Sequence, residues 1–155
     1  MKRGVEWFLG ILGVLVIAMI VFPIVAPAKH GPRRSPCLSN LKQSSVAMLM
    51  YLSDEDERFP PRDGWIDASY PYVKNWATYH CPQVLGTQWG YAFNGALDRA
   101  NEKKLKFPER VPMLYDSVNP IKNASDLVTS LPVVPRHRRN FMSYADGHAR
   151  GLVQH

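Results

Sequence analysis

The residues best suited to chemistry lie in the C-terminal third of the chain. His137, Asp146 and His148 are candidate metal ligands, and Asp116 is a candidate fourth member. Imidazole and carboxylate groups bind zinc or calcium, depending on the mixture of ligands. The spacing matches no established metal motif, so we favour a second interpretation, in which Asp146-Gly147 forms a turn and the histidines make structural hydrogen bonds. We therefore expect no cofactor, and a divalent metal at these residues is the alternative.

Aromatic and basic side chains suggest nucleic-acid binding, but the charge balance argues against it. Stacking rings combined with cations are how proteins bind single strands. The formal net charge is +6, of which residues 1–34 carry +4 and residues 35–155 only +2. This weak electrostatic footprint leads us to expect no nucleic acid, and the rings are better assigned to a core. The residues concerned are Arg136, Arg138, Arg139, Arg150, Tyr70, Tyr72, Trp76 and Tyr79.

The N-terminal segment differs from everything that follows it. From Trp7 to Ala28, 22 residues carry no charge. A helix of roughly 20 apolar residues spans a hydrocarbon layer about 30 Å thick. The alternative is a cleaved signal peptide, because Lys2 and Arg3 precede the run and small residues occupy positions 26 and 28. The run is longer than a typical signal-peptide core, so we favour an anchor; either interpretation exports the remainder.

The two cysteines, Cys37 and Cys81, allow two interpretations. His80 precedes Cys81, and a thiol beside a base can act as a nucleophile. Adjacent residues of a strand point to opposite faces, however, so this pair would not meet in an extended segment. An even number of cysteines in an exported protein most simply forms one disulfide. We expect the disulfide, and two buried thiols are the alternative.

The chain therefore divides into three segments. Residues 1–28 form a transmembrane anchor, and the glycine and prolines of residues 29–36 form a short basic hinge. Residues 37–155 form the exported domain. Ser35 is a good N-cap for a helix, since apolar residues at three- and four-residue spacing follow it as far as residue 52.

The pattern of the exported domain predicts an α+β fold, with one amphipathic helix packed on a small antiparallel sheet. From residue 64 onward, short aromatic and β-branched runs, among them residues 70–73, alternate with turn residues and predict strands. Asn94-Gly95 and Asp146-Gly147 are dipeptides typical of hairpin turns.

A set of short motifs recurs along the exported domain in a fixed order: Asn40, Leu41, Lys42, Gln43, Tyr51, Pro82, Asn94, His137, Asp146, Gly147 and His148. In residue type and order, these motifs resemble those of the prepilin-type, type II secretion pseudopilin-like proteins that are abundant in planctomycetes. The C-terminal signature of that family is a histidine, nine residues and then Asp-Gly, whereas eight residues separate His137 from Asp146 here.

The resemblance implies a pilin-like fold, a cytoplasmic N-terminus and a periplasmic domain. It also implies a prepilin peptidase site, for which the candidate residues are Gly4, Val5 and Glu6. Family members carry a glutamate fifth after the cleaved bond, whereas Glu6 is second after Gly4.

These observations predict a single-pass protein of the bacterial inner membrane that is not an enzyme. It would be a structural or interaction subunit of an envelope assembly related to type II secretion or type IV pili. The expected partners are the lipid bilayer and other pilin-like or secretion-system subunits, with no small-molecule substrate. One alternative is a periplasmic metal-binding protein or hydrolase that uses His137, Asp146 and His148. The other is a tethered binder of nucleic acid or polysaccharide.

Overall fold

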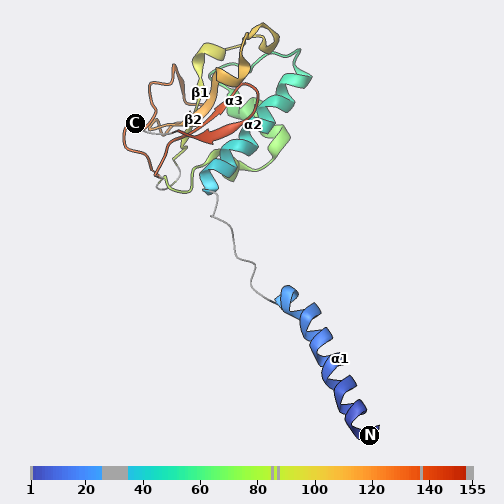
Figure 1. Ribbon diagram of the computed structural model, residues 1–155. Coiled ribbons are helices and arrows are strands. Elements are labelled where there is room, and N and C mark those ends of the chain that lie inside the picture. The colour runs from blue at the N-terminus through green and yellow to red at the C-terminus, as the bar shows by residue number, and fades with distance from the viewer. Residues whose placement is uncertain (1, 26–34, 85, 87, 137, 153–155) are drawn as a thin grey trace. The chain divides into compact units, whose positions relative to one another are not determined.

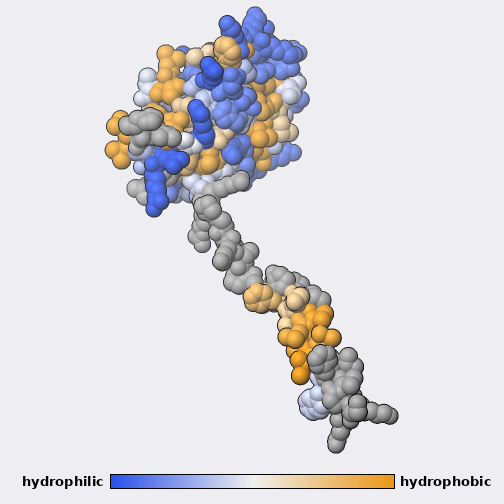
Figure 2. All heavy atoms as spheres, in the orientation of Figure 1, coloured by the Kyte–Doolittle hydropathy of each residue, from blue (hydrophilic) through white to orange (hydrophobic). Residues whose placement is uncertain are grey.

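The computed structural model describes residues 2–25, 35–84, 86, 88–136 and 138–152 (Figure 1). The chain divides into two units, Met1–Arg33 and Arg34–His155. The first contains helix α1 (Lys2–Val25), whose described side chains are exposed and mostly hydrophobic (Figure 2). A search of the described residues finds no helix with the length and apolar character needed to cross a membrane. The predicted hinge lies largely outside the described residues.

A mixed sheet of five strands forms the centre of the second unit, in the order β3-β1-β2-β4-β5. Strand β3 pairs parallel with β1, through Phe93 and Ser125, and the other neighbours are antiparallel. The prediction of a purely antiparallel sheet is therefore wrong for β3. The carbonyl of buried Ala124 accepts hydrogen bonds from Phe93 N (2.9 Å) and Trp65 Nε1 (3.1 Å), which draws this segment alongside β1. The strands are β1 (Tyr91–Asn94), β2 (Pro112–Asp116), β3 (Ser125–Asp126), β4 (Phe141–Tyr144) and β5 (Ala149–Gly151).

Helix α2 (Pro36–Asp54) packs on one face of this sheet, against β2, β4 and β5. Its N-cap is Ser35, and Pro36 begins the helix, where its missing N–H breaks no intrahelical bond. The predicted apolar face is buried, as Leu41, Met48 and Leu52 show. The α+β architecture with an amphipathic helix on a sheet is thus confirmed.

Helix α3 (Trp65–Val73) lies where the sequence predicts extended structure. Trp65, Ile66 and Ser69 are buried at helical spacing, with the helix packed against α2. This burial outweighs the β-propensity of the Tyr-Pro-Tyr-Val run and the missing N–H of Pro71, which lies near the end of the helix. A short 3₁₀ helix, η1 (Trp76–Tyr79), follows directly.

The two predicted hairpin turns have different outcomes. Asp146-Gly147 does join the antiparallel strands β4 and β5, as expected. Asn94-Gly95 does not make a hairpin, because the Asn94 side chain accepts a hydrogen bond from Ala96 N (3.1 Å) and starts a 3₁₀ helix. Three such helices separate β1 from β2: η2 (Gly95–Leu97), η3 (Glu102–Lys104) and η4 (Pro108–Arg110).

Candidate functional site

The turn between β4 and β5 positions the residues that the sequence nominates for chemistry. The Gly147 amide donates to the carbonyl of Tyr144 (2.8 Å), and the Tyr144 amide donates to the carbonyl of His148 (2.9 Å). Gly147 has a φ of +84°, in the left-handed region that favours glycine. A Cβ at this position would also overlap Cδ1 of Leu49 and lie 3.3 Å from its Cγ. The backbone conformation favours glycine here, and any larger residue would force the Leu49 side chain on α2 to shift.

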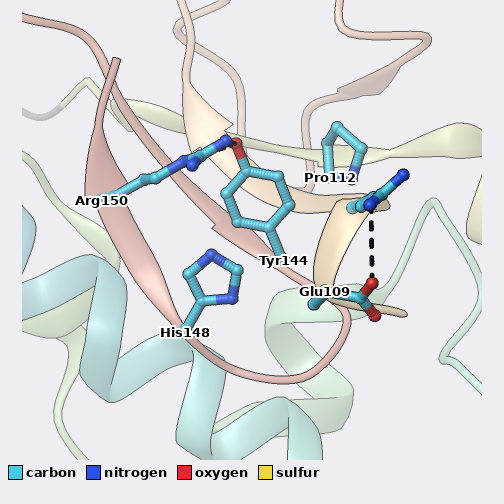
Figure 3. Close-up of a pocket in the computed structure, with 6 residues that line it drawn as sticks. Glu109, Pro112, Tyr144, His148 and Arg150 are labelled. Atoms are coloured by element: carbon cyan, nitrogen blue, oxygen red, sulfur yellow. Dashed lines mark hydrogen bonds and ion pairs between the residues drawn. The ribbon is translucent and has the colours of Figure 1, made fainter. Parts of the chain in front are cut away.

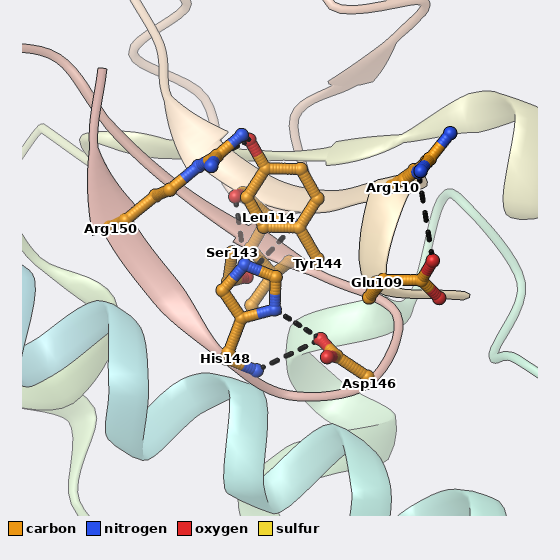
Figure 4. Close-up of polar contacts among 8 residues, drawn as sticks. All are labelled: Glu109, Arg110, Leu114, Ser143, Tyr144, Asp146, His148 and Arg150. Atoms are coloured by element: carbon orange, nitrogen blue, oxygen red, sulfur yellow. Dashed lines mark hydrogen bonds and ion pairs between the residues drawn. The ribbon is translucent and has the colours of Figure 1, made fainter. Parts of the chain in front are cut away.

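Asp146 and His148 meet across this turn, as Figure 4 shows. The Asp146 carboxylate accepts hydrogen bonds from the amide of His148 (3.1 Å) and from its Nδ1 (2.6 Å). The imidazole stacks on the ring of Tyr144, with 4.4 Å between centroids and 4° between planes. The carboxylate and the ring together fix the orientation of the histidine.

A shallow surface pocket of about 620 Å³ opens beside this pair (Figure 3). Arg150 donates from Nε (3.0 Å) and Nη2 (2.8 Å) to the hydroxyl of Tyr144. Across the pocket, Glu109 and Arg110 form a loose ion pair at 3.7 Å. The pocket therefore combines fixed donors with one opposing carboxylate.

The other predicted ligands do not join Asp146 and His148. Asp116 is 1 % exposed, and its Oδ2 accepts a hydrogen bond from the amide of Phe141 (2.6 Å), which ties β2 to β4. His137 lies outside the described residues. Across the described ranges, no three His, Cys, Asp or Glu side chains lie close enough together to hold a metal ion.

The arrangement at the turn supplies a histidine oriented by a carboxylate, which is half of a nucleophilic site. Ser143 is the neighbouring hydroxyl in β4, but it is fully buried. Its Oγ accepts a hydrogen bond from Leu114 N (3.2 Å) and donates one to the Leu114 carbonyl (3.3 Å). Both hydrogen bonds of this hydroxyl therefore hold β4 to β2. The geometry of the turn is that of a structural hydrogen-bonding cluster.

The motif residues of α2 hold neighbouring backbone in place. Asn40 Nδ2 donates to the carbonyls of Ala77 (3.0 Å) and His80 (2.9 Å), which secures η1 against the helix. Leu41 is fully buried, and Thr78 Oγ1 lies 3.5 Å from Oε1 of Gln43.

The remaining motif residues have mixed environments. Asn94 Nδ2 donates to the carbonyl of Pro112 (2.8 Å), which links β1 to the start of β2. Tyr51 is half-buried, whereas Lys42 and Pro82 are exposed. Gly4, Val5 and Glu6 belong to α1, and their side chains lie outside what the structure describes.

Cys37 and Cys81 form the disulfide that the sequence predicts, with 5.0 Å between their Cα atoms. Both residues are buried, and the bridge joins the first turn of α2 to the segment after η1. The Tyr91 hydroxyl donates to the carbonyl of Cys37 (3.0 Å). Burial raises the pKa of this phenol far above its ordinary value, so Tyr91 stays a neutral donor.

The assignment of the aromatic residues to the core is only partly correct. Tyr79 is fully buried, and its hydroxyl shares a hydrogen bond with the hydroxyl of Ser69 (2.9 Å). Trp76 is 42 % exposed, and Tyr70 and Tyr72 are half-buried.

The predicted basic patch is partly used for internal contacts. Arg136 donates from its guanidinium to the carbonyls of Gly90 (3.2 Å) and Ser117, so it braces two segments at the end of the sheet. Arg150 is engaged with Tyr144, whereas Arg138 and Arg139 are exposed.

No family model, curated protein or solved structure matches this chain.

Proposed function

We propose that this protein is a pilin-like, membrane-anchored structural subunit of a bacterial envelope assembly related to type II secretion or type IV pili. One observation carries the proposal: the Cys37–Cys81 disulfide closes a domain that follows a long uncharged run. Disulfides persist outside the reducing cytoplasm, so a disulfide-closed domain belongs in an exported protein. The uncharged residues from Trp7 to Ala28 supply a segment for export and for anchoring.

The same two features support an orientation. A single span with the disulfide on its C-terminal side leaves the N-terminus in the cytoplasm and the domain in the periplasm. The inner membrane is then the site of the anchor. The basic residues on both sides of the run contribute nothing to this choice, whereas the disulfide lies on one side only.

The contacts of several motif residues support a structural role. The side-chain amides of Asn40 and Asn94 donate to backbone carbonyls, and the backbone of the turn at Gly147 favours glycine. Such contacts determine a fold, whereas a reaction needs groups that point toward a substrate.

Exposed apolar side chains support contact with a neighbouring subunit. The long segment between β2 and β4 places several of them at the surface, with Val133 91 % and Val134 81 % exposed. Contiguous exposed apolar patches are typical of interaction surfaces, and this segment supplies apolar side chains from which such a patch could be built. The members of this apolar segment are Val118, Ile121, Leu127, Val133 and Val134.

Topology and processing test the proposal. The full-length chain with a C-terminal tag should resist carbonate extraction from membranes, and added protease should remove the tag from spheroplasts. Mass spectrometry of the mature N-terminus should find Val5, bearing a methyl group, if a prepilin peptidase acts. An uncut chain would support a plain anchor, whereas a start at Lys29 or a tag protected in spheroplasts would refute the anchored orientation.

A matched cross-linking pair tests the partner surface. A photoreactive residue in place of Val134 should give a defined adduct with a second membrane subunit. The same residue in place of Lys104, which is exposed on η3, should give none. Equal labelling from both positions would contradict a role for the apolar segment.

A further inference from the structure

Four rings from three segments of the chain meet on the surface of the domain, beside the disulfide. Tyr70 stacks on Trp76, with 3.8 Å between ring centroids and 16° between planes. Trp76 meets Trp89 edge to face (6.1 Å, 83°), and Trp89 stacks on His80 (4.2 Å, 30°). We call these residues, together with Lys122, the aromatic cluster. A pocket of about 270 Å³ is lined by Trp76, His80, Trp89 and Lys122.

The cluster is held in place by contacts that do not depend on a ligand. Asn40 secures the backbone on both sides of the buried Tyr79, at the carbonyls of Ala77 and His80. A Cβ on Gly90 would lie 2.7 Å from Cβ of Cys81, so glycine allows the segment of Trp89 to approach the disulfide closely. These constraints pre-form the site and reduce the entropy that a ligand must overcome on binding.

Polar groups lie at the rim of the pocket. Lys122 Nζ is 5.1 Å from the Trp76 ring centroid and forms an ion pair with Asp67. Hydrogen bonds from Lys122 and from Asn123 Nδ2 (2.8 Å) lower the pKa of the Asp67 carboxyl. His80 Nδ1 contacts the carbonyl of Gln88 (3.1 Å) and therefore carries the proton, which leaves Nε2 as an acceptor in the neutral ring.

We propose that the aromatic cluster binds a neutral glycan by stacking one sugar ring against its tryptophans. A pyranose has an apolar face of C–H groups and an edge of hydroxyls, which suits indole rings surrounded by a few polar groups. The volume of 270 Å³ lies just below the range of about 300–1,000 Å³ for pockets that hold drug-sized ligands. It therefore fits one ring of a longer chain.

The charges at the cluster favour a glycan over the two other ligands that aromatic rings bind. A quaternary ammonium group would bring a second cation beside Lys122, whose Nζ already lies 5.1 Å from the Trp76 ring centroid. A nucleic acid needs several cations to replace its counterions, whereas the charge of Lys122 is balanced by Asp67. An uncharged ligand meets neither obstacle.

Calorimetry on the full-length chain tests this inference. A polyoxyethylene detergent is used, because its head group contains no sugar, and the probes are chitotetraose and cellotetraose. We expect saturable binding of at least one probe, with a dissociation constant on the order of 1 mM. Trp76→Ala should weaken it at least about tenfold, and Trp76→Phe should weaken it less, since a ring remains. Phe107→Ala, at an exposed ring elsewhere, should leave the affinity unchanged.

Other outcomes would overturn the proposal. Absence of saturable heat with both sugars would refute it, as would equal losses from Trp76→Ala and Phe107→Ala. Tighter, salt-dependent binding of oligothymidylate would identify a nucleic-acid site, and binding of tetramethylammonium would identify a cation cage. Near-ultraviolet circular dichroism of each variant separates loss of the pocket from loss of the fold.

Discussion

Gly147 offers a sharp test of how the β4–β5 turn is built. Its φ of +84° disfavours any residue with a Cβ, and that atom would also overlap the side chain of Leu49 on α2. Gly86 provides a matched control, because its φ is +67° but a Cβ there would have no atom within 4 Å. Gly147→Ala therefore adds strain and overlap, whereas Gly86→Ala adds strain alone.

The size of the effect follows from these two contributions. A left-handed conformation costs a residue with a Cβ roughly 1–2 kcal/mol. Overpacking of a filled site costs about 1–3 kcal/mol in addition, and the half-buried Leu49 can relax part of it. We therefore expect Gly147→Ala to lower the free energy of unfolding by about 2–4 kcal/mol, and Gly86→Ala by about 1–2 kcal/mol.

Urea unfolding of the full-length chain, followed by tryptophan fluorescence, measures both variants. Leu49→Ala removes the atoms that the new Cβ would overlap, so the double variant with Gly147→Ala should be more stable than the sum of the single effects predicts. We expect a favourable coupling of about 1 kcal/mol. Equal effects of the two glycine substitutions, or strict additivity with Leu49→Ala, would refute this account of the turn.

Three further variants test the rest of the scaffold. Cys37→Ser opens a loop that spans 44 positions, and the chain-entropy model gives a loss of about 4 kcal/mol in unfolding free energy, measurable with urea. Asn40→Asp removes the donor to two backbone carbonyls and should cost about 2 kcal/mol, visible as a lower Tm. Burial raises the pKa of Asp126, but hydrogen bonds from partners that include Tyr115 outweigh it and hold this pKa low. The stabilisation that results is present above the unfolded-state pKa and lost as pH falls, so Tyr115→Phe should move acid unfolding to higher pH.

The elements that the sequence predicted correctly depend on local signals. Helix α2 follows from a cap, a proline at the first helical position and an apolar face, all within 19 consecutive residues. The turn at Asp146-Gly147 follows from a dipeptide whose glycine tolerates the left-handed region. In both places the local preference and the tertiary contacts favour the same conformation.

The elements that the sequence mispredicted depend on partners far along the chain. Helix α3 is stabilised by burial of Trp65 and Ile66, which overrides the local β-propensity of its C-terminal half. Strand β3 is only two residues long and pairs parallel with β1 across more than thirty positions. Periodicity within a short window carries no information about such a pairing.

The contacts of the candidate site were predicted only in part, because some join residues close in sequence and others join distant segments. The contact of His148 with Asp146 follows from their spacing of two residues within the β4–β5 turn. The separation of Asp116 from them follows from the register of β2 with β4, which places Pro112, at the other end of β2, opposite Tyr144. Trp89 and Lys122 were not nominated, because their partners lie on other segments. The concentration of aromatic residues on both sides of Cys81 was the available signal, since a disulfide fixes the segments that flank it.

Asn40 supports both the fold of the domain and the position of the aromatic cluster. Variants can therefore separate effects on stability from effects on sugar binding. Asn40 holds the carbonyls around η1, and this segment carries Trp76. Asn40→Asp should therefore lower both the Tm and the affinity for the sugar probes, whereas Trp76→Ala should have its larger effect on the affinity, because that ring is 42 % exposed. Calorimetric scans and titrations of the same two preparations measure both quantities. An Asn40→Asp protein that lost stability but kept full affinity would show that α2 does not position the cluster.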